Sequence, residues 1–326
     1  MSGFSLASSF PWNPGEEYNM TYDDIPGFNK SHSNNYIEPT PDSSLEKDIT
    51  TIITILFCIF GFIANGTVIW LLGFCIKRNQ FTTYILNLSI ADTGLLTANF
   101  ITEIHWMAKY SYDSLLCDVF DHIFYFTYNT GQFLLTAISI DRCVCVLFPI
   151  LYRCHRPQHL TRTICALIWG LSSLSPGIHL ILHLNNLTSY NIVNFQLIVS
   201  GLLCLPLMTI STLILFIKVY FKPRQRRRGK LIVIILLALL FFIVFSFPLN
   251  AFYIADYIFH SETPLLAFYG FLCASLNSSV NPFIYFLVGR KKRGRPITNM
   301  KAILQNAFRD EENSPEEEET TAETQL

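Results

Sequence analysis

Residues 231–258 read LIVIILLALLFFIVFSFPLNAFYIADYI, with Asp256 the one charged residue among them. A helix that crosses a bilayer needs about 20 largely apolar residues, because a backbone amide without a hydrogen-bond partner in hydrocarbon costs several kcal/mol. This stretch meets the requirement, and it predicts a membrane-spanning helix.

Six further stretches meet the same test on either side of this one. The seven predicted spans are residues 49–76, 82–107, 116–147, 160–183, 193–221, 231–258 and 264–288. The composition agrees, since 51% of the residues are hydrophobic and 14% charged, against roughly 25% charged in an average soluble domain. We therefore expect an all-α membrane protein: a seven-transmembrane helix bundle with an amphipathic eighth helix.

The basic residues predict the orientation of the bundle, because cytoplasmic loops retain Lys and Arg. With the N-terminus outside, only Lys30, Lys47 and Lys109 of the 23 basic residues face outward. We expect a multi-pass protein of the plasma membrane with an extracellular N-terminus and a cytoplasmic C-terminus. The first 48 residues lack a basic segment followed by an apolar one, so the first span is expected to act as an uncleaved insertion signal.

The chain is predicted to have four parts. Residues 1–48 form an extracellular tail with glycosylation sequons at Asn19 and Asn29, and Asn186 carries a third sequon in the second outer loop. Residues 49–288 form the bundle, residues 289–309 an amphipathic helix on the membrane surface, and residues 310–326 an acidic, disordered cytoplasmic tail.

An acid next to an arginine stands near the inner end of the third span, in Asp141-Arg142-Cys143. An acid so placed can hold the guanidinium in one state and release it to a partner in another, which is what a switch requires. The alternative is a basic flank that only marks the cytoplasmic side. The residues alone leave both interpretations open.

The seventh span contains the polar run Asn277-Ser278-Ser279-Val280-Asn281-Pro282-Phe283-Ile284-Tyr285. Asn277, Asn281 and Tyr285 are four residues apart and share one helical face, while Pro282 permits a kink. Polar groups in a membrane need polar partners, and Asp92 and Asn65 are the candidates. The alternative to a switch is static interhelical hydrogen bonding.

Acidic residues gather at the predicted outer ends of the spans: Glu103, Asp113, Asp118, Asp121, Asp256 and Glu262, opposed only by Lys109. Such a vestibule attracts cations. Asp121, Phe124, Tyr125 and Tyr128 fall on one helical stripe, which places an acid above an aromatic wall. A stripe at this spacing is more often packing than pocket, but as a binding surface it predicts an extracellular basic peptide or small cationic ligand.

Several positions together resemble the rhodopsin-like (class A) G-protein-coupled receptors over about residues 49–308. They are Asn65, Asp92, Asp141-Arg142-Cys143 with Pro149, Trp169, Pro206, Phe242 with Pro248, and Asn281-Pro282-Phe283-Ile284-Tyr285. The stretch from Tyr128-Asn129-Thr130-Gly131 to Tyr152-Arg153-Cys154-His155-Arg156-Pro157 is similar to the Mas-related receptors, a group of sensory and vascular peptide receptors.

The resemblance implies that an agonist swings the sixth span outward and opens a cavity for a heterotrimeric G protein. The implied activation switch comprises Asn65, Asp92, Asp141, Arg142, Phe242, Pro248, Asn277, Asn281, Pro282 and Tyr285. The implied G-protein contacts are Arg142, Ile150, Arg226, Arg227 and Arg228. Asp92 and Asn281 resemble the sodium site of the superfamily, although Gly131 stands where many relatives have a serine ligand. The tail itself suggests two further partners: arrestin, recruited by phosphorylation of Ser314, Thr320 and Thr321, and a PDZ domain, whose ligand pattern Thr324-Gln325-Leu326 matches.

Two positions depart from the family pattern. Cys117 stands where most relatives form a disulfide to the second outer loop, but residues 184–192 contain no cysteine. Ser246, two residues before Pro248, replaces a tryptophan that many relatives use as an activation lever. We expect Phe242 or Phe245 to take over that role.

Other functions are less consistent with the sequence. A transporter or channel, the alternative kept open, would need ionisable residues along the whole bundle, whereas the acids here cluster at the outer end and at Asp92. No enzymatic signature, cofactor motif or dedicated metal site is evident, and a net charge of -1 argues against nucleic acid as a partner.

Overall fold

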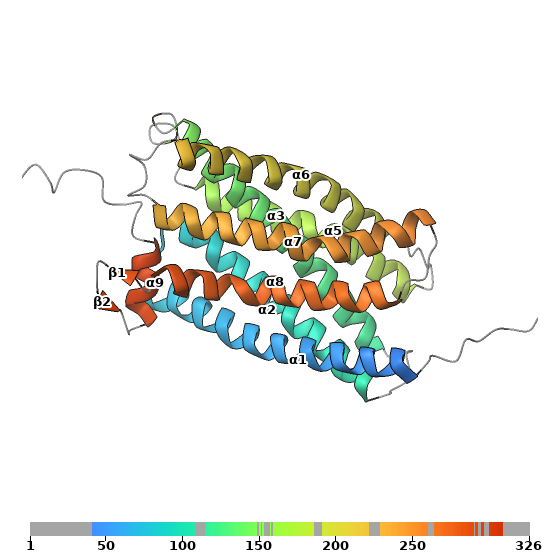
Figure 1. Ribbon diagram of the computed structural model, residues 1–326. Coiled ribbons are helices and arrows are strands. Elements are labelled where there is room, and N and C mark those ends of the chain that lie inside the picture. Colours follow the sequence, from blue (N-terminus) through green and yellow to red (C-terminus); the bar gives the residue numbers. More distant parts are fainter. Residues whose placement is uncertain are drawn as a thin grey trace, which may run out of the picture. The chain divides into compact units, whose positions relative to one another are not determined.

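The computed structural model describes residues 41–108, 115–148, 150, 152, 157, 159–185, 191–221, 229–259, 264–289, 291–292, 295–296 and 300–308. Seven long helices occupy this part of the chain (Figure 1). They are α1 (Pro41–Trp70), which continues into the π-helical turn η1 (Leu71–Cys75), α2 (Gln80–Met107), α3 (Leu115–Leu147), α5 (Leu160–Leu184), α6 (Asn191–Phe221), α7 (Gly229–Phe259) and α8 (Pro264–Gly289). The two-residue strands β1 (Lys291–Lys292) and β2 (Arg295–Pro296) pair antiparallel, and α9 (Met300–Phe308) follows.

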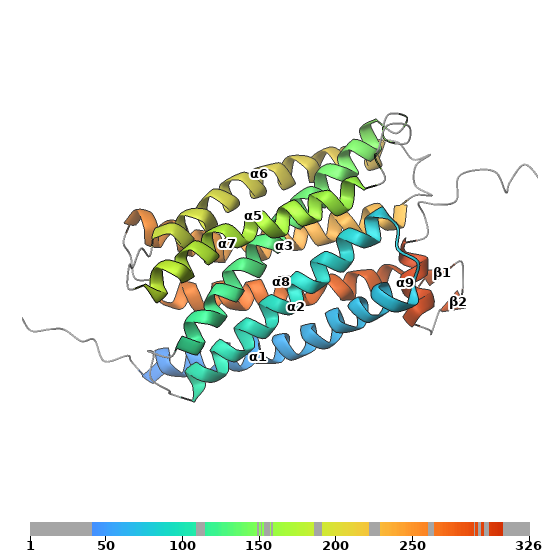
Figure 2. The same ribbon diagram turned by 180° about the vertical axis from the view of Figure 1, so that it is seen from behind.

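The seven long helices lie side by side as one bundle, seen from opposite sides in Figure 1 and Figure 2. In both views α1 and α6 lie at opposite edges, and α9 lies at the end of the bundle where α8 finishes. The predicted all-helical, seven-span bundle is confirmed.

Most helices begin within two residues of the predicted start, but the first and the last begin much farther from it. α1 begins at Pro41 and not at residue 49, because hydropathy detects only the apolar part, whereas a proline at the first helical position favours an earlier start. The last helix is shorter than the predicted 289–309, because β1 and β2 precede it. Pro296 disfavours helical backbone at Arg295, so the helix can form only beyond this hairpin.

Five stretches within these helices are long and apolar enough to cross a membrane by themselves: Leu45–Cys75, Cys117–Leu147, Leu160–Leu182, Ser200–Lys218 and Leu236–Ala255. In the described residues α2 and α8 do not meet that criterion. α2 packs against α3, α5 and α8 and buries polar side chains such as Asn99 and Glu103. A helix surrounded by other helices needs fewer apolar residues than one that faces lipid.

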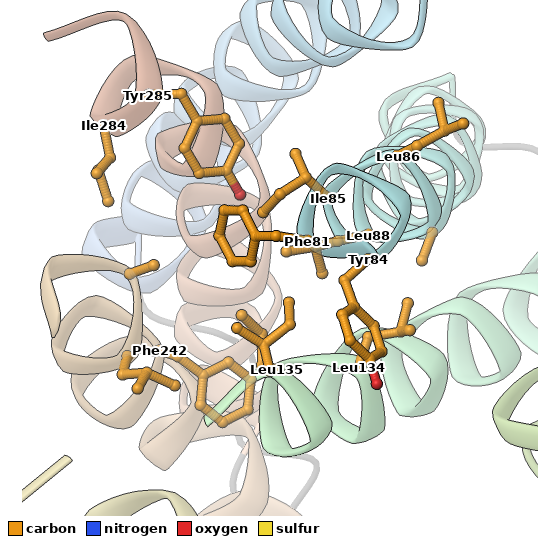
Figure 3. Packing of buried hydrophobic residues seen from close by; sticks show 14 of the residues in the cluster. Phe81, Tyr84, Ile85, Leu86, Leu88, Leu134, Leu135, Phe242, Ile284 and Tyr285 are labelled. Atoms are coloured by element: carbon orange, nitrogen blue, oxygen red, sulfur yellow. The ribbon is translucent and has the colours of Figure 1, made fainter. Parts of the chain in front are cut away.

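The main hydrophobic cluster lies in the half of the bundle that contains Arg142. Figure 3 shows Phe81 of α2 beside Tyr285 of α8, both of which line a small apolar cavity together with Leu135 of α3 and Leu239 of α7. Phe242 of α7 belongs to the same cluster and is 1% exposed. Four helices therefore meet here through apolar side chains.

Direct hydrogen bonds join α1 to α8. The Ser279 hydroxyl donates to the carbonyl oxygens of Phe57 (2.9 Å) and Ser275 (2.7 Å). The Asn65 amide donates to the carbonyl oxygens of Ser278 and Gly61, each at 3.0 Å. Such close approach requires a small residue on α1, and Gly61 supplies it.

Replacing Gly61 with alanine should destabilise the receptor. The added Cβ would lie 2.7 Å from Leu96 Cδ1 and would also collide with Ser279, and overpacking of this kind costs about 1–3 kcal/mol. Gly66→Ala is the matched control, because its Cβ would have no neighbour within 4 Å. Thermal unfolding of the detergent-purified receptors measures the difference. Equal melting temperatures for the two variants would contradict the close packing of α1 and α8.

Candidate functional site

Arg142 on α3 is buried at 3% exposure and is held by three neighbours. Its Nη2 atom donates to Asp141 Oδ2 at 2.5 Å and to the Tyr152 hydroxyl oxygen at 3.1 Å. The Tyr152 hydroxyl in turn donates to Asp141 Oδ2 at 3.0 Å. The guanidinium carbon lies 4.9 Å from the centre of the Phe81 ring. A buried cation requires such compensation, so this arrangement holds Arg142 in one position.

The sequence pattern assigns Tyr152 no role of its own. Its position eleven residues after Asp141 is no signal by itself, because it lies beyond the end of α3, where helical spacing no longer tells which side chains meet. The predicted G-protein contact Ile150 is 80% exposed close to this cluster in sequence. Arg226, Arg227 and Arg228 lie outside the described residues.

The predicted polar contact between the second and seventh spans is present. Asn281 Nδ2 on α8 donates to Asp92 Oδ2 on α2 at 3.0 Å, and the Ser278 hydroxyl donates to the same carboxylate. Asp92 is 4% exposed. In the described residues Asn65 is not hydrogen-bonded to Asp92; its amide donates instead to the backbone of α8 at Ser278. The structure thus brings α1, α2 and α8 together through polar groups.

The remaining switch residues lie on α7 and α8. Pro248 lies inside α7 and Pro282 inside α8, and Tyr285 is buried in the hydrophobic cluster.

The buried Asn277 side chain keeps an amide oxygen that has no hydrogen-bond partner in the described residues. Oxygen atoms are the ligands that hard cations prefer, and sodium binding at Asp92 and Asn281 stays a prediction.

The acid-over-aromatic stripe on α3 divides into a half-buried and a buried part. Asp121 is half-buried and accepts a hydrogen bond from the Thr102 hydroxyl of α2 at 3.4 Å. Phe124 and Tyr128 are fully buried and stack at 5.9 Å between ring centres. Tyr125 is half-buried and meets Tyr253 of α7 edge to face at 6.0 Å. The deeper rings are packed, so Asp121 and Tyr125 are the more accessible members.

The other predicted pocket acids have different surroundings. Asp118 is half-buried one helical turn before His122 on α3. Glu103 is 5% exposed and accepts a hydrogen bond at 2.9 Å from the Thr51 hydroxyl of α1, which places it at a helix contact and makes it a weaker candidate for ligand binding. The Asp256 side chain and the glycosylation sites Asn19, Asn29 and Asn186 lie outside the described residues.

A polar layer in the middle of the bundle was missed from the sequence. Asn250 Nδ2 on α7 donates to the Tyr128 hydroxyl oxygen on α3 at 3.2 Å, and the Ser200 hydroxyl on α6 donates to Asn129 Oδ1 on α3 at 2.8 Å. Gly201 makes room for Asn250, since a Cβ there would lie 2.5 Å from Asn250 Oδ1. The rule that a polar residue in an apolar span needs a partner would have identified these residues.

The layer lies beside Ser246, the position where the lever tryptophan is missing. Of the two residues expected to replace it, Phe242 is buried in the main cluster, and Phe245 stacks on Phe241 of the same helix at 5.6 Å. The Asn250–Tyr128 hydrogen bond is the more direct connection between α7 and α3.

Seven packed helices, with a restrained arginine at one end of α3 and a half-buried acid at the other, are the arrangement of a transmembrane receptor. Residues 64–285 match the family described as 7 transmembrane receptor (rhodopsin family). The chain belongs to this family of G-protein-coupled receptors, whose members are not enzymes.

The similar proteins specify the group within the family. Rat proto-oncogene Mas is 37% identical over 261 residues, which cover 77% of this chain and 81% of Mas. Rat Mas-related G-protein coupled receptor member H is 37% identical over 268 residues, 78% of this chain and 82% of the relative. Human member D is 36% identical over 267 residues, 78% and 83% respectively. The chain is thus related to Mas and the Mas-related receptors, and the transporter or channel alternative is set aside.

Removing the Tyr152 hydroxyl should raise signalling without agonist. Tyr152→Phe deletes the hydrogen bonds to Asp141 and Arg142, and a bond to a charged group is worth about 1.5–3 kcal/mol. Basal G-protein dissociation in cells should rise several-fold at equal surface expression. Tyr269→Phe, which removes a hydroxyl bonded to Glu46 on α1, is the control and should leave basal G-protein dissociation unchanged. Basal dissociation in Tyr152→Phe equal to that of the wild type would show that Tyr152 does not restrain Arg142.

Proposed function

We propose that this receptor lies in the plasma membrane with its N-terminus outside, binds a basic peptide or small cationic amphiphile at Asp121, and activates a heterotrimeric G protein through Arg142. The observation that carries the proposal is the contrast between the two ends of α3. Arg142 is buried and fully compensated, whereas Asp121 is half-buried and bonded to a neutral hydroxyl.

The ligand class follows from the chemistry near Asp121. A hydroxyl donor leaves the carboxylate charge in place, and Asp118 adds a second acid three residues earlier on α3. Two half-buried carboxylates in a partly desolvated region attract cations more strongly than exposed ones. Tyr125 offers a half-buried ring face for a cation–π contact. These features favour a ligand with a positive group and an adjoining apolar surface.

We expect the end of α3 that carries Arg142 to signal by releasing this residue from its present partners. Asp141, Tyr152 and Phe81 stabilise the guanidinium while it is buried, so a helix movement that separates them leaves a charge in need of a new partner. A backbone or side-chain acceptor of the G protein can supply one. Ile150 is exposed nearby, and the basic residues Arg226, Arg227 and Arg228 are proposed to form the rim of the same contact.

Further proposals concern the tails and the outer loop. Glycosylation at Asn19, Asn29 and Asn186, arrestin recruitment by the phosphorylated tail, and PDZ binding at Thr324–Leu326 fit the proposed orientation.

A last proposal concerns the place of the receptor within the family. The equal identities to rat Mas and to rat member H, 37% each, support a position near these two branches. They favour neither branch over the other.

Two substitutions on α3 should separate ligand recognition from G-protein coupling. Cells expressing the receptor are treated with a panel of Lys- and Arg-rich amphipathic peptides while G-protein dissociation is recorded. Asp121→Lys should weaken the potency of active peptides roughly tenfold or more, because an attraction becomes a repulsion of about 1–2 kcal/mol or greater. Arg142→Ala should abolish the response to every peptide at equal surface expression.

Asp48→Lys on α1 is the matched control, because Asp48 is an exposed acid outside the α3 stripe. It should leave potency within about twofold of the wild type, as expected for a screened surface charge. Equal losses at Asp48 and Asp121 would mean that overall charge decides the response. A full response in Arg142→Ala would refute coupling through this residue.

A further inference from the structure

Two histidines from different helices face each other near the acidic end of α3. His122 Nε2 on α3 lies 2.7 Å from His179 Nδ1 on α5, and the ring centres are 4.9 Å apart. His122 is half-buried and His179 is 9% exposed. The pair is not part of the activation switch or the acid-over-aromatic stripe.

The protonation of His122 follows from its other ring nitrogen. His122 Nδ1 lies 2.5 Å from the Asp118 carbonyl oxygen, which can only accept a hydrogen bond. Neutral His122 therefore carries its proton on Nδ1, and Nε2 presents a lone pair toward His179. A backbone carbonyl that fixes the tautomer in this way is the usual outer-shell partner of a metal-ligating histidine.

The distance between the two nitrogens is close to what a metal ion requires. Zinc binds histidine nitrogen at about 2.0–2.1 Å in tetrahedral geometry, which sets two such nitrogens roughly 3.3 Å apart. The pair would have to open by about half an ångström, and His179 would carry its proton on Nε2 so that Nδ1 is free to bind. Rotation of two side chains is sufficient for both changes.

Asp118 is the nearest source of a third ligand in the sequence of α3. It lies four residues before His122, so the two side chains share one face of the helix. In the described residues no three histidine, cysteine or acidic side chains already surround one point, so Asp118 would turn toward the pair on binding, and water would complete the coordination. Imidazole nitrogen with one carboxylate suits zinc and disfavours magnesium or calcium, which prefer oxygen ligands.

We propose that His122 and His179, with Asp118, form a binding site for Zn²⁺ that links α3 to α5. The bound ion would replace the hydrogen bond that joins His122 of α3 to His179 of α5 by bonds from both imidazoles to one metal. It also places positive charge next to the acidic stripe of α3. The site shares Asp118 with the proposed cation-attracting surface, but zinc binding can be measured without the peptide ligand or G-protein coupling.

Thermal unfolding of the full-length receptor, purified in detergent and stripped with a chelator, tests the site without reference to signalling. A ligand that binds only the folded state raises the melting temperature. Micromolar ZnCl₂ should raise that of the wild type by several degrees, and added chelator should reverse the rise. His122→Gln and His179→Gln, which keep a polar side chain at each position, should each abolish the shift. MgCl₂ should have no effect on any of these proteins.

His105→Gln is the matched control, because His105 is also a half-buried histidine but lies in the last turn of α2, outside the proposed site. The His105→Gln receptor should keep the full zinc shift. Asp118→Asn should raise the zinc concentration needed for half of the shift tenfold or more, because even the loss of an outer-shell partner of a metal ligand typically costs about 10–100-fold in affinity. The absence of a shift in the wild type, or a shift that survives in both His122→Gln and His179→Gln, would overturn the proposal.

Discussion

Every polar group inside a bilayer must find its partner within the protein, because lipid offers none. In this receptor one such group is Asp92, a carboxylate of α2 that is 4% exposed and bonded to α8. The amide of Asn281 and the hydroxyl of Ser278 meet it from α8. Those two bonds hold α8 at one register against α2, and Asn65 and Ser279 fix the register of α1 through backbone carbonyls. Gly61 permits the approach on which these hydrogen bonds depend.

The same constraint explains the cluster around Arg142, but with a different outcome. Asp92 is satisfied by neutral groups of a neighbouring helix, whereas Arg142 is satisfied by the adjacent acid, by Tyr152 and by the face of Phe81. Asp141 lies on α3 beside Arg142, whereas Tyr152 and Phe81 come from two other segments, so a relative movement of the segments removes part of the compensation from a buried charge. Loss of a hydrogen bond to a charged group costs about 1.5–3 kcal/mol. An incoming protein partner that accepts hydrogen bonds from Arg142 can offset that cost, which is the requirement for a state that forms only with the partner present.

The sequence predicted the features that follow from hydropathy and from isolated polar residues. The seven helices, the Asp141–Arg142 pair and the Asn281–Asp92 contact could be predicted because each follows from apolar length or from the need of a polar residue for a partner. The surroundings of Glu103 could not be predicted. A carboxylate near a helix end can line an acidic vestibule, or it can accept a hydrogen bond from a neighbouring helix, as Glu103 does from Thr51. The sequence could not tell that Phe124 and Tyr128 are buried while Tyr125 is half-buried. Spacing shows which residues share a helical stripe, but not which of them the neighbouring helices cover. The pairing of His122 with His179 joins residues 57 apart in the chain, which spacing alone does not bring together. The pairing of Arg142 with Tyr152 joins residues only ten apart, but it depends on the path of the backbone after α3, which no helical spacing predicts.

The contacts of α7 differ along its length. In the half that contains Phe242 and Leu239 it meets the neighbouring helices through apolar side chains around a small cavity, and such contacts have no preferred direction. Farther along, beyond Pro248, Asn250 donates a directional hydrogen bond to Tyr128 and lies against Gly201 of α6. A helix held by a hydrogen bond on one side of a proline, and by non-directional packing on the other, bends more easily than it shifts as a whole. This division favours an activation movement in which the Asn250 end stays in place while the Phe242 end swings. We therefore expect the layer around Asn250 and Tyr128 to act as the fixed point of that movement in a chain whose Ser246 cannot act as a tryptophan lever.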